Sequence, residues 1–131
     1  MRLSDLFEDE TQFTWVVPYN GNTVRNGSEK VVWIDPVKLD ASFAKDPTFY
    51  VGPGGTGEGV IKGRYPRFND WVAANDGKNI MMPEVCLGAR NEITFSNGRH
   101  RYAWMRDHGV RKMLMLVPVN QADEIEKRFG A

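Results

Sequence analysis

The fold of this chain is decided by the stretch Phe95-Ser-Asn-Gly-Arg-His-Arg-Tyr-Ala-Trp104. A β-type run, Glu92–Phe95, ends at Asn97-Gly98, and a helical pattern then begins with three basic side chains. A strand that enters a helix through a tight turn leaves backbone N–H groups free at the helix N-terminus. Cations at that end oppose the helix macrodipole. We therefore expect an anion to bind there, with phosphate first because arginine offers it a bidentate fork.

Composition and charge narrow the class of protein. The 131 residues suit one domain with a real core, and 17 basic residues cancel 17 acidic ones, so no global field draws the chain onto nucleic acid. Charge is uneven: residues 1–14 hold one basic and four acidic side chains, a net of −3. One cysteine and two histidines exclude an internal disulfide and a zinc site. Without a membrane-spanning apolar run or a signal peptide, a soluble cytoplasmic protein is the expectation.

Local patterns predict a compact α+β domain with a mixed sheet, spanning residues 1–131. Turn signals at Asn20-Gly21 and Asn26-Gly27 indicate a hairpin or an irregular loop between them. Strands are expected at 13–17, 30–34, 82–87, 92–95 and 112–119. Helices are expected at 4–10, 39–44, from Pro66 to a stop at Gly77, from Arg99 to about His108, and after Asn120. After a β-rich start, the order is helix, strand, strand, helix, strand, helix.

Several side chains are expected to serve the fold. Asn120 is a predicted N-cap for the last helix, which turns Ala122, Ile125 and Phe129 inward. Trp33, Trp71 and Trp104 occupy apolar positions of a strand and two helices, where core packing is favoured over base stacking. Cys86 is favoured as a small core residue. Asp35-Pro36 and Asp46-Pro47 are explained as turns rather than metal ligands.

The signature turn resembles that of the ParB/sulfiredoxin-like superfamily, in which a Gly-x-(His/Arg)-Arg turn opens a helix and holds nucleotide phosphates. The resemblance extends to 31–36 with Leu39 as the first strand and its turn, to the Pro-x-x-Val-like strand at 82–85, and to 115–119 as the closing strand. It implies a core at 31–119, preceded by an extension or hairpin at 1–30 and followed by a helix at 120–131. Arg99 stands where sulfiredoxins carry the catalytic cysteine, so sulfinic-acid repair is not expected.

With this resemblance, the residues of the turn are expected to divide the work. Gly98 lets the backbone approach the anion, and Asn97 adopts the left-handed conformation or caps the helix. Arg99 and Arg101 bind phosphate oxygens, while His100 hydrogen-bonds the same group or moves a proton near neutral pH. The competing interpretation is a solvated basic helix start that pairs with surface carboxylates.

A glycine-rich segment, Val51–Val60, gives a second candidate element. It formally matches G-x-G-x-x-G but does not open a helix directly after a buried strand, and no Walker motif follows. We expect either a mobile surface loop or a lid over a ligand. The resemblance implies that a helix in the next segment sends a basic residue, Arg64 or Arg67, toward the nucleotide. Glu58 is a candidate base or magnesium ligand.

The leading functional hypothesis is a nucleotide-binding enzyme that transfers or hydrolyses a phosphoryl group of ATP or CTP with Mg²⁺. Its predicted catalytic residues are His100 and Glu58, and no metal is held by the protein alone. Two alternatives stay open. One is a non-catalytic DNA- or protein-binding accessory module of a plasmid, phage or toxin system, and the other is a nuclease.

Overall fold

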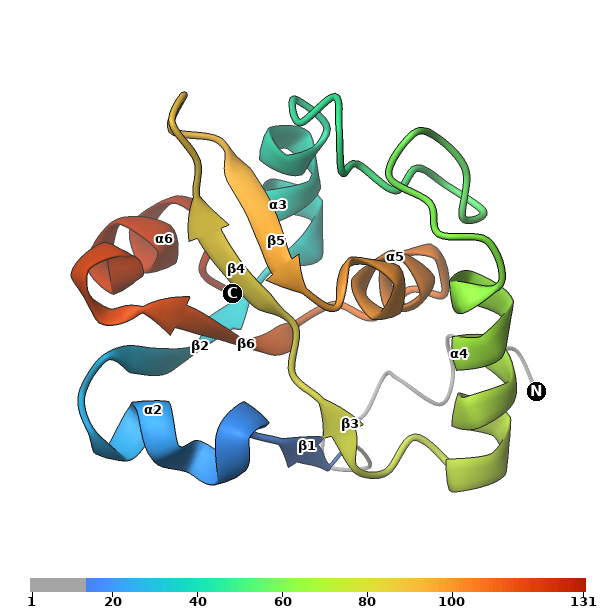
Figure 1. Ribbon diagram of the computed structural model, residues 1–131, viewed down its shortest axis with the longest axis horizontal. Coiled ribbons are helices and arrows are strands. Elements are labelled where there is room, and N and C mark those ends of the chain that lie inside the picture. The colour runs from blue at the N-terminus through green and yellow to red at the C-terminus, as the bar shows by residue number, and fades with distance from the viewer. Residues whose placement is uncertain (1–13) are drawn as a thin grey trace.

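The computed structural model describes residues 14–131 and has an α+β fold with a mixed sheet (Figure 1). The strands are β1 (Trp15–Val16), β2 (Glu29–Ile34), β3 (Ile80–Met81), β4 (Glu84–Leu87), β5 (Ile93–Asn97) and β6 (Met113–Pro118). The helices are η2 (Pro18–Gly21), α2 (Asn22–Arg25), α3 (Pro36–Phe43), α4 (Arg64–Asn75), α5 (Arg99–Asp107), η3 (Val119–Gln121) and α6 (Ala122–Phe129).

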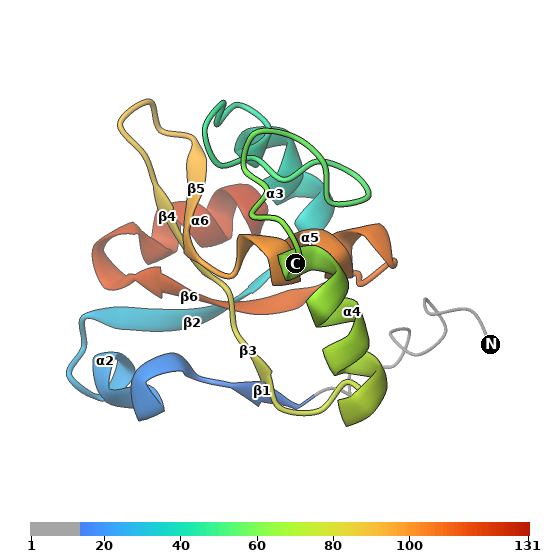
Figure 2. The ribbon, with the colours of Figure 1, turned by 45° about the vertical axis from the view of Figure 1, so that its right-hand side comes forward.

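The main sheet has four strands in the order β2-β6-β4-β5. The β2–β6 and β4–β5 pairs are antiparallel, and β4 joins β6 in parallel at Glu84 and Leu116. A separate parallel pair, β1–β3, lies beyond the N-terminal end of β4 (Figures 1 and 2). This order makes β5 an edge strand of the main sheet, and the chain passes from that edge directly into α5.

The core is formed where the sheet meets the helices. Asp35 caps α3 by accepting a hydrogen bond from the Val37 N–H at 2.9 Å, and Pro36 occupies the first helical turn, where a missing N–H has no consequence. The apolar face of α6 buries Ala122, Ile125 and Phe129 as predicted. In both ribbon views α4 stands beside α5 at the end of the molecule remote from α6 (Figures 1 and 2). Side chains with no exposed surface include those of Ile34, Leu39, Phe43, Tyr102 and Met115.

Most predicted elements are confirmed, with shifts at their ends. The region between Asn20 and Gly27, predicted as a hairpin or an irregular loop, contains the end of η2 and all of α2. Tyr19 and Asn20 take positive φ angles of 59° and 53°. Of the predicted strand 82–87, only β4 (Glu84–Leu87) is extended in the main sheet, and the unpredicted β3 precedes it at Ile80–Met81. Pro83, between the two strands, has no N–H to donate to a ladder. The predicted helix 4–10 lies outside the described residues.

Two side-chain predictions are wrong. Asn120 does not cap α6: it lies in η3, and no side chain caps that helix. Trp33 is 37% exposed on β2, where its ring meets that of Trp15 edge-on and Lys112 lies 4.9 Å from its centroid. Trp104 is buried as predicted.

Candidate functional site

The start of α5 has the geometry that the sequence predicted, with one change of residue. Gly98 takes the left-handed conformation at the N-cap position, with φ 83° and ψ 20°, while Asn97 remains the last residue of β5. No side chain caps α5, and its first turn contains no acidic residue. The prediction that Asn97 caps the helix is therefore wrong. Its amide nitrogen donates instead to the buried carboxylate of Glu84, 3.1 Å away.

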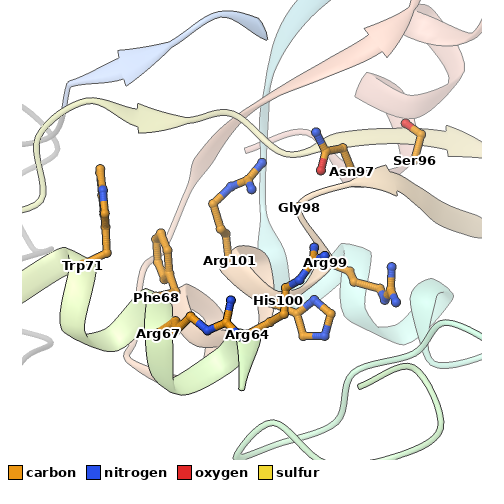
Figure 3. A pocket seen from close by; sticks show the side chains of 10 residues that line it. All are labelled: Arg64, Arg67, Phe68, Trp71, Ser96, Asn97, Gly98, Arg99, His100 and Arg101. Atoms are coloured by element: carbon orange, nitrogen blue, oxygen red, sulfur yellow. The ribbon is translucent and has the colours of Figure 1, made fainter. Parts of the chain in front are cut away.

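The start of α4 repeats this pattern. Gly63 is a left-handed N-cap residue with φ 88°, no side chain caps the helix, and Arg64 and Arg67 occupy its first turn without an acidic residue. The helix begins two residues before Pro66, which removes one N–H where none is needed. Two helices that start with a left-handed glycine and arginines thus lie side by side, and Figure 3 shows Arg64 and Arg67 facing the residues that open α5.

A pocket of about 440 Å³ lies between these two helix starts. It is lined by Arg64, Arg67, Phe68, Trp71, Ser96, Asn97, Gly98, Arg99, His100 and Arg101 (Figure 3). The structure brings together in this one lining all seven residues that the sequence predicted to bind phosphate. Four of the lining side chains are arginines, and no carboxylate of residues 14–131 lines the pocket. The free N–H groups and the positive helix ends add to the same electrostatic potential.

Arg101 is the most buried of these cations and has spare hydrogen-bonding capacity. Its Nε donates to the Met81 carbonyl at 3.1 Å, whereas its Nη2 is buried without a partner. A Cβ on Gly98 would stand 2.7 Å from that Nη2, so a larger residue here would displace the guanidinium. Burial lowers the pKa of Arg101, and the nearby Glu84 acts in the opposite direction. Arginine nevertheless stays charged in proteins.

Arg99 and His100 contact the α3–α4 loop (residues 44–63). The Nε of Arg99 donates to the Gly59 carbonyl at 2.8 Å, and the Ile61 N–H donates to Nε2 of His100 at 2.8 Å. Burial, followed by the charges of Arg99, Arg64 and Arg101, lowers the pKa of His100 to about 4. His100 is therefore neutral near pH 7, with the proton on Nδ1, and does not carry a titrating proton there.

The other end of α5 holds the same loop. Arg106 donates to the Val51 carbonyl at 2.7 Å and pairs with Asp40 at 2.9 Å. Asp107 accepts from the Gly54 N–H at 2.8 Å and from the Tyr65 hydroxyl at 2.7 Å. Burial lowers the pKa of Arg106, but its hydrogen bonds to the two carboxylates outweigh burial and raise it. The glycine-rich segment is thus fastened to α5 along its length.

One wall of the pocket is aromatic. The rings of Phe68 and Trp71 are nearly parallel, 13° apart, with centroids separated by 5.7 Å. Both lie on the α4 side of the pocket, beyond Arg101 in the close view (Figure 3). Trp71 is half-buried and lines the pocket, so its predicted role in the core is only part of its environment. The pocket therefore combines a cationic region with flat apolar surface.

The predicted catalytic pair is not assembled. His100 lines the pocket, whereas Glu58 is exposed on the α3–α4 loop and does not line it. Among residues 14–131, no cluster of histidine, cysteine, aspartate or glutamate is suited to hold a metal ion. Sequence reasoning missed Ser96 and Phe68 as lining residues. The spacing of Phe68 and Trp71 on one helix was the available signal, whereas the prediction for Trp71 considered the core alone.

No helix in the described part of the chain is both long and apolar enough to span a lipid bilayer.

Comparison with known proteins gives one informative likeness. No family model matches the chain, and no curated protein matches it. The crystal structure of a gold(I) cyanide derivative of the oncogenic suppression activity protein, a plasmid fertility inhibition factor, superposes with a TM-score of 0.60 at 14% sequence identity. The match covers 80% of this chain and 58% of that chain. At this identity the likeness shows a shared fold, and the ParB/sulfiredoxin-like resemblance stays a prediction.

Proposed function

We propose that this chain binds the phosphate groups of a nucleotide in the pocket between α4 and α5. The observation that carries the proposal is a lining in which the described residues supply four arginines and no carboxylate, at the uncapped starts of two helices. An anion there would satisfy backbone N–H groups and the buried Nη2 of Arg101 at once. Arg64 and Arg67 have no ion pair with another described residue, so they stay free for a ligand.

The aromatic wall favours a nucleotide over a small inorganic anion. Trp71 offers a flat surface close to the arginines. A ligand that carries both a phosphate and a planar ring could place the phosphate on the arginines and the ring on Trp71. Mg²⁺ would arrive with the phosphates of ATP or CTP, because the protein's described residues provide no carboxylate cluster for it.

Phosphoryl transfer or hydrolysis is a further step that needs a group to activate the nucleophile. His100 accepts from the Ile61 N–H and has a pKa of about 4, and Glu58 lies outside the pocket. We therefore propose binding as the primary function and place any turnover second. His100→Ala separates the two: turnover that disappears while nucleotide affinity is retained would assign chemistry to the imidazole.

The binding test is calorimetry with ATP, CTP, GTP and their diphosphates in the presence of Mg²⁺. Arg101→Ala removes the most buried cation, and a charge-assisted hydrogen bond contributes roughly 1.5–3 kcal/mol, so affinity should fall about tenfold or more. Arg111→Ala is the matched control, because Arg111 is exposed and lies outside the pocket. Absence of binding by any of these nucleotides would remove the proposal.

A second candidate is an accessory factor of a plasmid or related mobile element that acts on DNA or on a protein without catalysis. The observation that favours it is the fold shared with a plasmid fertility inhibition factor. Binding through phosphate contacts must weaken steeply as salt rises, whereas binding to an apolar protein surface changes little. A salt titration with DNA therefore tests this candidate.

A further inference from the structure

A second cavity of about 310 Å³ lies at the other end of β5. Its walls come from the start of the α3–α4 loop and from the β4–β5 turn, and they include Lys45, Asp46, Phe49, Arg90, Glu92 and Thr94. Phe49 is 43% exposed, which is unusual for a phenylalanine on a chain with a well-filled core. The proposed nucleotide pocket does not include this cavity.

The two cavities lie along one face of the same strand. Side chains alternate between the faces of a strand, so Thr94 and Ser96 point to the same side, while Ile93 and Phe95 are buried on the other. Thr94 lines the second cavity and Ser96 lines the first. Between them the Arg99 guanidinium lies 5.3 Å from the centroid of the Phe49 ring. Arg99 lines one cavity and Phe49 the other, so they form a shared wall.

The first cavity is strongly cationic, whereas the second is close to neutral. In the part of the chain that the structure describes, the first cavity has four arginines and no carboxylate. In the second, Lys45 and Arg90 are balanced by Asp46 and Glu92. The Asp46 carboxylate is buried and accepts from the Thr48 and Phe49 N–H groups and from the Thr94 hydroxyl, so its oxygens are already occupied by protein donors. A strongly cationic cavity beside a neutral one with an exposed ring fits a phosphate followed by a base.

We propose that a short segment of single-stranded nucleic acid lies along this face of β5. This inference rests on the proposed phosphate pocket: a backbone phosphate binds at Arg99 and Arg101, and the adjoining nucleotide places its base on Phe49. Trp71 provides a second ring at the far end of the first cavity. Cationic grooves interleaved with aromatic rings are how proteins bind single strands, because every base has a flat face to stack. A duplex has no unpaired base to offer either ring.

The test is calorimetry of the full chain with a 5′-phosphorylated thymidine tetranucleotide and with thymidine 5′-monophosphate. The tetranucleotide should bind at least about tenfold more tightly, because one stacked base contributes that much. Phe49→Ala should abolish most of this gain and leave the affinity for the mononucleotide, whereas Phe49→Tyr should preserve the gain. Val37→Ala, at a position 79% exposed on α3, is the control and should change neither affinity.

Each outcome decides a different point. Equal affinity for the two ligands, or a tetranucleotide affinity unaffected by Phe49→Ala, overturns the strand track while leaving the phosphate pocket in place. Absence of binding by both ligands removes the phosphate pocket itself. A tetraglutamate peptide that binds as tightly as the tetranucleotide would show that charge alone is recognised, and it would also overturn the assignment to nucleic acid.

Discussion

Acidification is expected to destabilise this protein through His100. The pKa of its buried imidazole is lowered from 6.5 to about 4, by burial first and then by Arg99, Arg64 and Arg101. Unfolding restores the ordinary value, so between pH 6.5 and about 4 the unfolded chain binds more protons than the folded one. The stability linked to this group is therefore fully present above pH 6.5 and is lost as the pH falls through that window.

The loss of stability on acidification can be calculated from the pKa values of His100 in the unfolded and the folded chain. At about 1.36 kcal/mol per pH unit, the difference between 6.5 and about 4 corresponds to at most about 3 kcal/mol, of which about 2 kcal/mol is lost by pH 5. Urea unfolding at pH 7.5 and pH 5 measures it in the wild type and in His100→Gln, whose amide oxygen still accepts from Ile61 but does not titrate. Other titrating groups cancel in the comparison. Equal losses in the two proteins, or an imidazole that titrates near 6.5 by NMR, would refute the reasoning.

Three further predictions concern the loop and the pocket. Arg106→Ala should lower the free energy of unfolding by roughly 3 kcal/mol, because it removes the ion pair with Asp40 and the hydrogen bond to the Val51 carbonyl. An unchanged urea midpoint would contradict the anchoring of the loop. Gly59→Ala should lower the free energy of unfolding by about 2 kcal/mol or more, because its Cβ would stand 2.1 Å from the Phe49 carbonyl oxygen. At Gly54 a Cβ would meet nothing within 4 Å, so Gly54→Ala should lower it only by the roughly 1 kcal/mol that a left-handed conformation costs alanine. Bound phosphate should raise the pKa of His100 by offsetting the nearby arginines, so calorimetry at pH 5 in buffers of different ionisation enthalpy should show proton uptake; no uptake would place the anion away from His100.

Features of the fold that depend on neighbouring residues were predictable from the sequence. Asp35-Pro36, interpreted as a turn before a helix at 39–44, starts α3 three residues earlier by a cap and a fixed φ. Gly109 follows α5 with a φ of 83°. The face of β2 that would be covered was not predictable in this way. Alternation says that Trp33 and Val32 point to opposite sides, but only the packing of distant segments decides which side faces the core.

The candidate site divides in the same manner. Gly98 and the basic residues of α5 form a contiguous segment whose turn chemistry is local, so the anion site could be predicted. The contacts of the α3–α4 loop could not be predicted, because its anchors are far away in the sequence: Arg106 donates to the Val51 carbonyl, and Asp107 accepts from the Gly54 N–H. The glycine content indicates conformational freedom of this segment in the unfolded chain. In the folded chain, hydrogen bonds to α5 hold the same segment in place.

The positive charge at the start of α5 is only partly compensated by contacts within the chain. Arg99 donates its Nε–H to a loop carbonyl, and the neutral His100 accepts a hydrogen bond from a loop N–H. Both residues therefore hold the α3–α4 loop. A carbonyl dipole, however, neutralises no formal charge, and none of the described carboxylates lines the pocket. Mutual repulsion among the arginines and the two positive helix ends therefore remains as an unfavourable contribution to folding. Any anion that relieves it must stabilise the folded state, so raising phosphate concentration should raise the melting temperature more than chloride does at equal ionic strength.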